Sequence, residues 1–259
     1  MMSSWKIYED LIDGIPSGLT VDDCVIGLNW TMVRSGENVG LACTLRGHSI
    51  SGFTKGSFTG RSLREAAALC RSWNMIEATV GMAACNCFYN TAGRMRELGA
   101  DPSAGEEKTG TGTSVFDQPL ENMSGKKVAV VGHFPYIERQ LGGICELSVL
   151  ERDPEGSDYM DSACEYLLPE QDYVFITGMT FTNKTLPRLL ELCRKGRTVL
   201  VGPSSPITPV LFDYGVDSIA GFYVTDQELA GTLVSQAAHT EIFRCGRRIV
   251  YADTRQNNC

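Results

Sequence analysis

The feature that most constrains this chain is a unit that recurs along its second half. A short apolar run is followed by a loop rich in glycine, serine or threonine, and then by the start of a helix. The run at 127–131 ends in Gly132-His133, and the runs at 172–177 and 198–201 lead into similar loops. Repetition of strand, loop and helix is typical of an open parallel sheet. Loops after the carboxyl ends of such strands line the ligand crevice, so a site is expected there.

The second half as a whole alternates between the two kinds of element, which places the chain in the α/β class. We therefore expect a mostly parallel sheet that is covered by helices on both faces. The predicted strands are 127–131, 146–150, 172–177, 198–201, 217–222 and 247–251, and the predicted helices are 135–142, 158–167, 183–195, 206–213 and 226–238.

The first half predicts a smaller α+β unit. Ser4 is expected to cap an amphipathic helix with Tyr8 and Leu11 on its buried face. Alternating apolar residues at 25–32 and 39–45 predict a hairpin with one buried and one solvated face.

Two further helices are expected in this half. Ser62-Leu-Arg-Glu65 reads as a capping box, and Asn74-Met-Ile-Glu77 repeats that pattern before an apolar stretch at 76–85. A helix that is apolar nearly all round should be buried between layers.

Residues 99–118 are rich in glycine, threonine and charged residues, as an extended linker would be. We place a domain boundary near residue 115. This gives an N-terminal α+β domain with its linker at 1–115 and an α/β domain at 116–259.

Composition narrows the classes of partner. The chain has 259 residues and a formal net charge of −8, so it has no general attraction for nucleic acid or for anionic lipid. No apolar run approaches the roughly 20 residues of a membrane span, and the start lacks the apolar core of a signal peptide. The 10 cysteines are scattered without a Cys-x-x-Cys pair, which indicates reduced, buried thiols and a cytoplasmic location.

Gly132 and His133 follow the first strand of the α/β half. Glycine permits a tight turn there, and backbone N–H groups at a helix start can hold an anion. The dinucleotide fingerprint G-x-G-x-x-G is absent, because Phe134 and Ile137 occupy the later glycine positions, so NAD binding is not favoured. His133 is either a ligand-facing residue or a packed loop histidine bonded to a backbone carbonyl.

Glu151 and Asp153 follow the second strand. Acids at this position bond a ribose in dinucleotide folds, and they serve equally well for a metal or an amine. The competing interpretation is a solvated loop with an Asp-Pro turn. Asp158 and Asp161 are interpreted as the acidic first turn of the next helix.

The third and fourth loops offer hydroxyl and amide groups to a carboxylate or a phosphate. Their candidates are Thr177 and Thr180, then Gly202 and Ser204. Helix capping competes for the threonines, whereas Ser204 is the freer serine, since Ser205 with Pro206 forms a cap.

Glu77 and Asn86 belong to the apolar helix of the first half. Capping alone explains Glu77, and a ligand-binding role is the alternative. Asn86 needs a polar partner, either backbone or ligand.

The motifs together resemble a known family. The strings at 131–135, 151–154, 176–186 and 201–217, with 72–86 upstream, resemble the family of uncharacterised prokaryotic proteins described as "putative heavy-metal chelation". The resemblance implies a domain similar to the small domain of enolase, then a Rossmann-like domain, with a site between them. It also implies the handling of a metal or a metal chelate, without a defined metal-ligand set.

The main hypothesis is a cytoplasmic protein that binds a small anionic ligand or a metal chelate in an interdomain cleft. His133, Glu151 and Asp153 are then the candidate metal ligands, and the cofactor is a divalent metal. The alternative is an enzyme acting on a nucleotide-like or cofactor-precursor substrate, with Glu151 or His133 as general acid or base. A structural protein with a vestigial cleft is a third possibility, and assembly into a homo-oligomer stays open.

Overall fold

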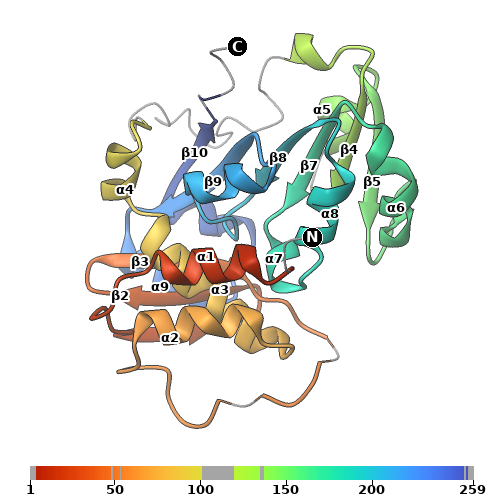
Figure 1. Ribbon diagram of the computed structural model, residues 1–259. Coiled ribbons are helices and arrows are strands. Elements are labelled where there is room, and N and C mark those ends of the chain that lie inside the picture. The colour runs from red at the N-terminus through yellow and green to blue at the C-terminus, as the bar shows by residue number, and fades with distance from the viewer. Residues whose placement is uncertain are drawn as a thin grey trace.

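The computed structural model describes residues 4–47, 49–52, 54–100, 120–134, 137–253 and 255. The predicted linker at 99–118 and the boundary near 115 lie almost wholly outside this part of the chain. Two sheets organise the described residues (Figure 1). The larger has seven strands, and the smaller has three strands from the N-terminal half.

The larger sheet is parallel except at one edge. Its spatial order is β10-β9-β8-β7-β4-β5-β6, and only β10 runs antiparallel to its neighbour. The chain therefore leaves β4 in one direction and resumes at β7 in the other, which is the topological switch point of a doubly wound sheet. The strands are β4 (Lys127–Val131), β5 (Glu146–Glu151), β6 (Tyr159–Met160), β7 (Tyr173–Thr177), β8 (Arg197–Val201), β9 (Ser218–Val224) and β10 (Gly246–Ala252).

Both faces of this sheet are buried, as expected. Ala129 and Ile176 belong to a core cluster that also contains the N-terminal helices, while Val130 and Phe175 pack with Ile137 on the opposite face. The helices are η3 (Leu120–Met123), α5 (Ile137–Leu141), η4 (Asp161–Ala163), α6 (Cys164–Leu167), η5 (Leu168–Glu170), α7 (Met179–Thr182), α8 (Leu186–Leu192), η6 (Pro209–Tyr214), α9 (Gln227–Ser235) and η7 (Thr240–Cys245).

Two of the predicted helices are wrong in detail. The segment predicted as a helix at 158–167 opens with β6, because Asp158 is held by loop contacts instead of starting a helix. The helix predicted at 183–195 is interrupted: Lys184 has a left-handed backbone with φ of 66°, and α8 begins only afterwards.

The smaller sheet consists of β1 (Asp23–Ile26), β2 (Trp30–Ser35) and β3 (Asn38–Cys43), all antiparallel. The single strand predicted at 25–32 is therefore two strands. Tertiary contacts cause the break: the Asn29 side chain donates to the Ala237 carbonyl at 2.9 Å, and a Cβ at Gly27 would lie 2.5 Å from the Val234 carbonyl oxygen.

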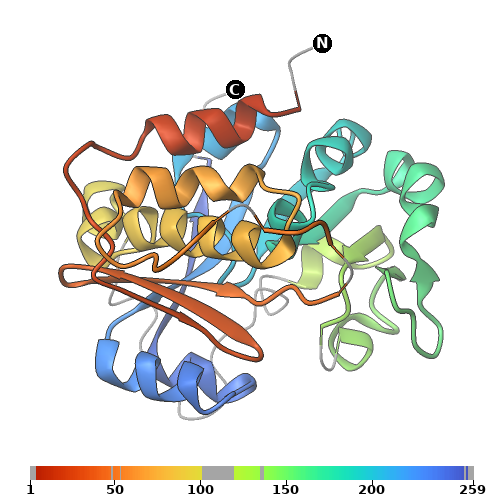
Figure 2. The same cartoon turned by 90° about the horizontal axis from the view of Figure 1, so that it is seen from below.

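The prediction of a solvated face on this sheet is also wrong. Helices cover one side and α9 covers the other, as Figure 2 shows. Trp30 and Met32 pack with Leu233 and Val234 of α9 in one buried cluster. The helices on the other side are α1 (Lys6–Asp13), α2 (Leu63–Ala68), η1 (Leu69–Arg71), α3 (Met75–Tyr89) and α4 (Ala92–Glu97).

Helix α3 is buried nearly all round, as predicted. Asn74 caps it by accepting hydrogen bonds from the backbone N–H groups of Ile76 and Glu77. The other three predicted caps are wrong. Ser62 makes no side-chain cap bond to α2, and Trp5 stands at the N-cap of α1 in place of Ser4. Thr208, and not Ser205, caps the helix after β8.

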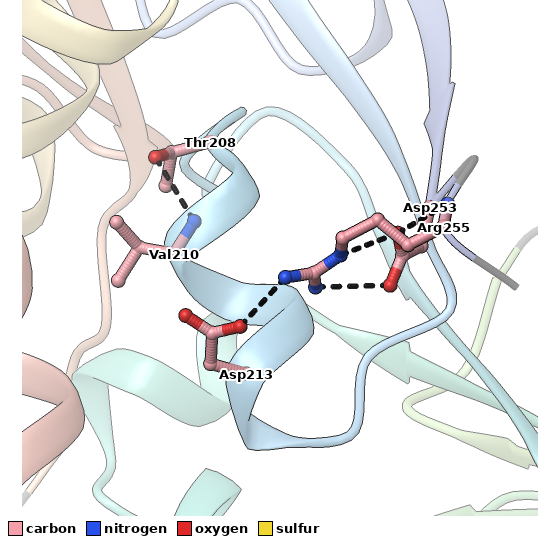
Figure 3. Close-up of polar contacts among 5 residues, drawn as sticks. All are labelled: Thr208, Val210, Asp213, Asp253 and Arg255. Carbon is pink, nitrogen blue, oxygen red and sulfur yellow. Dashed lines mark hydrogen bonds and ion pairs between the residues drawn. The ribbon is translucent and has the colours of Figure 1, made fainter.

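The end of the described chain is tied to η6. Arg255 contacts both carboxylate oxygens of Asp253 and reaches Asp213 at 2.9 Å (Figure 3). Thr208 caps η6 by accepting from the backbone N–H of Val210, also drawn in Figure 3. These contacts fix the loop after β8 from its outer side.

Tyr8 links α1 to the larger sheet, and its removal gives a first prediction. The buried Tyr8 hydroxyl donates to the Phe181 carbonyl at 2.9 Å, and burial raises the pKa of Tyr8, so it stays a donor. We expect Tyr8→Phe to lower the free energy of unfolding by about 1 kcal/mol, measured by urea denaturation. Tyr166→Phe, at a largely exposed tyrosine, should change nothing. Equal stability of both variants would show that the bond contributes nothing.

Candidate metal centre

The loop after β4 is shaped by Gly132. Its φ is 103°, a conformation that side-chain-bearing residues rarely adopt, and its N–H donates to the Leu150 carbonyl at 2.9 Å. A Cβ here would lie 2.9 Å from Cγ2 of Thr177. Glycine therefore lets the loops after β4 and β7 approach each other at the switch point, and it delivers His133 to the carboxyl edge of the sheet.

Glu151, at the end of β5, joins this loop to its own. One carboxylate oxygen accepts from the backbone N–H of His133 at 2.8 Å, and the other accepts from that of Arg152 at 2.6 Å. Each oxygen thus accepts a short hydrogen bond from a backbone amide, and Glu151 holds the backbone of His133 in place.

Asp158 meets His133 from the loop before β6. Its Oδ2 lies 3.0 Å from Nδ1 of His133 and accepts from the backbone N–H of Glu155 at 3.2 Å. The Asp158 side chain is only 1% exposed, whereas that of His133 is 36% exposed. The second oxygen of Asp158, Oδ1, is buried and has no hydrogen-bond partner. A buried carboxylate oxygen without a partner is costly, so it indicates a missing cation or donor.

Glu138, in the first turn of α5, completes a group of three. Ligand atoms of His133, Glu138 and Asp158 all lie within 4.8 Å of one another. In the tetrahedral geometry of Zn²⁺, ligand atoms bound at about 2.0–2.2 Å lie about 3.3–3.6 Å from one another. The group must therefore contract by about 1 Å, and rotation of the exposed Glu138 side chain can supply that movement. The residues therefore fit one small divalent ion.

The other residues predicted near this edge have different surroundings. Asp153 is exposed and lies outside the group of three. Thr180 donates its hydroxyl to the Thr177 carbonyl at 2.6 Å, so it serves the local turn. Gly202 has φ of 100° with open space where a Cβ would stand, and its N–H donates to the Ala220 carbonyl.

Asn86 and Ser204 lie in the packed seam between α3, β3 and the loop after β8. Asn86 donates to the carbonyls of Leu41 and Pro203 at 2.8 and 3.0 Å, and Ser204 accepts from the backbone N–H of Cys43 at 2.9 Å. Asn90, which the sequence analysis missed, extends this seam with three buried bonds to backbone groups. These residues hold the two halves together and make no hydrogen bond with His133 or Asp158.

Glu77 is buried and fastens the segment before α2. Its carboxylate accepts from the backbone N–H of Thr54 and from the hydroxyl of Ser72, both at 2.6 Å. In a capping box, Glu77 would accept from the backbone N–H of Asn74. Here the hydroxyl of Ser72 accepts from that N–H instead.

Of the three residues in this group, the sequence analysis named only His133 as a candidate ligand. Asp158 was interpreted as part of a helical first turn, and Glu138 is an ordinary acid in a short helix. No spacing pattern joins the three, since they come from separate loops and a helix. The sheet order, which sets β5 beside β4 and β6 beside β5, brings them together.

None of the cysteines in the described part of the chain belongs to this group. The nine described cysteines are free thiols, and most are buried. Burial raises the pKa of Cys87 to about 12, and it raises those of Cys164 and Cys193 to the same level. Because a metal binds the thiolate, these neutral thiols are poor ligands.

Comparisons with known proteins agree with the resemblance seen in the sequence. Residues 114–253 match the model of the DUF364 family and residues 8–89 match that of DUF4213, both described as "Putative heavy-metal chelation". An uncharacterized protein of Methanocaldococcus jannaschii is 29% identical over 217 residues, covering 80% of this chain and 78% of that protein.

Two solved structures share the fold. A DUF364 protein of unknown function from Desulfitobacterium hafniense has a TM-score of 0.89 and 39% identity, covering 98% of this chain and 100% of that one. Another, from Pyrococcus horikoshii, has a TM-score of 0.79 and 23% identity, covering 96% and 99%. In the part of the chain that the model describes, no helix has the length and apolar character of a membrane span.

Proposed function

Since the chain belongs to the DUF364 family, we propose that it binds a small divalent metal ion through His133, Glu138 and Asp158. The observation that carries this proposal is the grouping of one imidazole and two carboxylates within 4.8 Å, in which Asp158 also has a buried oxygen, Oδ1, without a hydrogen-bond partner. A cation there would satisfy the orphaned oxygen and offset the cost of burying the charge. The description of the family supports the same class of ligand.

The pair of His133 and Asp158 also resembles a catalytic acid–base dyad. Such a dyad needs only the single contact of 3.0 Å between Nδ1 and Oδ2. It gives no role to Oδ1 of Asp158 or to the nearby Glu138. Metal binding gives a role to all three side chains, and we therefore favour it over the enzyme hypothesis.

The chemistry of the ligands selects the ion. One imidazole and two carboxylates suit Zn²⁺, Mn²⁺ or Fe²⁺, whereas soft ions such as Cd²⁺ prefer thiolates. Three protein ligands leave coordination positions open. We propose that these positions take water or the donor atoms of a small anionic chelator, so that the protein handles an ion or its chelate.

The finer architecture is also proposed. We retain the boundary near residue 115, with an enolase-like domain before it and a Rossmann-like domain after it. The metal group belongs wholly to the second of these. The Asn86 amide donates to two backbone carbonyls, although its Oδ1 is also buried without a hydrogen-bond partner. The grouping of three possible metal ligands favours a site at the carboxyl ends of β4 and β5 over one in an interdomain cleft.

Isothermal titration of metal-free protein with Zn²⁺ tests the proposal. We expect one saturable site in the wild type and its loss in His133→Ala. The matched control is His239→Ala, an exposed histidine before η7, which should bind as the wild type does. Absence of saturable binding by folded wild-type protein, or equal binding by His133→Ala, would overturn the proposal.

Glu151→Gln tests the positioning role assigned to that residue. The amide keeps the size of the side chain, but it turns one of the two acceptors for the His133 and Arg152 amides into a donor. We expect Zn²⁺ affinity to fall about 10-fold, as with other outer-shell partners of metal ligands, while the number of sites stays the same. Asp153→Asn, two residues on, should bind normally. Complete loss of the site in Glu151→Gln would instead make Glu151 a direct ligand.

A further inference from the structure

A second recess lies away from the metal group, between the N-terminal helices and the loop that joins α7 to α8. Its volume is about 270 Å³. Segments remote in sequence contribute to it, namely the start of α1, the turn before α3 and the loop at 183–187. The lining residues are Ser4, Trp5, Tyr8, Trp73, Lys184 and Pro187.

Aromatic rings form one wall of this recess. The Trp5 and Trp73 rings meet edge to face with centroids 5.9 Å apart, and Trp5 packs on Tyr8 at 5.5 Å. Trp73 is nevertheless 52% exposed, which is unusual for so large an apolar side chain. Tyr8 is held in place by its bond to Phe181. The wall is therefore an apolar surface in which about half of Trp73 is left in solvent.

Lys184 supplies the one charge in the lining. Its Nζ donates to the Thr182 carbonyl at 2.7 Å and lies 5.8 Å from the centroid of the Trp73 ring. Within the described chain no carboxylate pairs with it, and none of the lining side chains is acidic. The ammonium has three protons to donate, and only one is taken by a protein acceptor. An anion can therefore be accommodated without displacing an existing ion pair.

The backbone at Lys184 is held in a costly conformation. Its φ of 66° costs about 1 kcal/mol or more for a residue with a side chain, and glycine would avoid that cost. Asn183 stabilises the turn by accepting from the backbone N–H and the hydroxyl of Thr185. This turn places the Lys184 side chain beside the aromatic wall. We infer that the side chain is needed there, which explains why the position is not glycine.

We propose that this recess binds a small planar aromatic carboxylate, with its ring on the tryptophan wall and its carboxylate on Nζ of Lys184. Stacking on indole accounts for the exposed face of Trp73. A single ammonium matches a single carboxylate, whereas a phosphate would call for the several N–H groups of an arginine or a helix start. The volume suits a compound of one or two fused rings. This site is independent of the metal proposal.

Calorimetric titration of metal-free protein with 2-naphthoate tests the site. The neutral 2-naphthamide presents the same rings without the charge. We expect saturable binding of 2-naphthoate, with 2-naphthamide about 10-fold weaker, as for a hydrogen bond to a charged group. Because the protein is metal-free in this titration, failure here leaves the Zn²⁺ result untouched, and the reverse also holds.

Three variants separate the contributions. Lys184→Met should lower 2-naphthoate affinity about 10-fold and leave 2-naphthamide unchanged. Trp73→Leu should weaken both compounds, and Lys195→Met, which removes a surface lysine paired with Glu170, should weaken neither. No saturable binding of 2-naphthoate by folded wild-type protein would overturn the proposal. Equal binding of it by wild type and Lys184→Met would do the same.

The pH dependence gives a further readout. Burial lowers the pKa of Lys184 to about 8. The ammonium therefore loses its proton above that value in the free protein, well below the usual range for lysine. We expect the affinity for 2-naphthoate to fall as pH rises from about 8 towards 10, and to stay flat in Lys184→Met. A flat profile for the wild type over that interval would remove Lys184 from the site.

Discussion

Replacing Asp158 with alanine is expected to lower the affinity for Zn²⁺ about 100-fold. Changes to outer-shell partners of metal ligands lower affinity by about 10- to 100-fold, and the loss of a direct ligand should reach the upper end of that range. The change removes the buried Oδ1 and also the contact that orients His133. The remaining imidazole and Glu138 would form a two-ligand site that is open to solvent. The measurement is calorimetric titration of metal-free protein, as for the wild type.

Asp161→Ala provides the matched control. Asp161 lies three residues further on, is exposed, and pairs with Arg152 at 3.1 Å without belonging to the group of three. It should bind Zn²⁺ as the wild type does. Zn²⁺ should also raise the melting temperature of the wild type and of Asp161→Ala, but not that of Asp158→Ala, because only a ligand that binds the folded state stabilises it. Equal titrations for both aspartate variants would contradict the assignment.

Replacing Gly81 with alanine should destabilise the protein severely. Gly81 lies in the middle of α3, where alanine would ordinarily favour the helix by about 1 kcal/mol. Here an ideal Cβ would overlap the backbone nitrogen of Cys70 and lie 2.5 Å from the carbonyl carbon of Leu69. Both atoms belong to the backbone of η1, so no side-chain rotation relieves the overlap. We expect a net loss of about 3 kcal/mol in the free energy of unfolding.

Gly231→Ala in α9 shows the opposite balance and serves as the control. The nearest atom to a Cβ there is Cε of Met32, at 3.8 Å, which is an ordinary contact. The helix preference for alanine then dominates, and we expect a gain of about 0.5–1 kcal/mol. Urea denaturation measures both variants. If Gly81→Ala proved as stable as the wild type, α3 and η1 could not be packed as closely as described.

The central strands β4, β7 and β8 could be predicted because each is a buried apolar run closed by a loop residue, whereas the short exposed strand β6 was not predicted. The run at 127–131 and that at 198–201 agree with β4 and β8 to within one residue. The buried character of α3 was also readable from its composition. These features depend on neighbours in sequence, which a pattern of residues records directly.

What could not be predicted depends on partners that are distant in the chain. Asn29 breaks a strand because it reaches Ala237, and Ser204, which we expected to be the freer serine, is buried and accepts from the Cys43 amide. Asp158 leaves its expected helix for a contact 25 residues away. The residues on either side of such a side chain are the same whether it faces solvent, a backbone group or a metal. Its role is therefore decided by the order of the strands, which sets its distant neighbours.

The most direct test of the central claim is a crystal of the protein soaked in Zn²⁺, with diffraction recorded at the zinc absorption edge. We predict an anomalous peak at about 2.0–2.2 Å from ligand atoms of His133, Glu138 and Asp158. A zinc peak at cysteine sulfur, with none among these three side chains, would contradict the account.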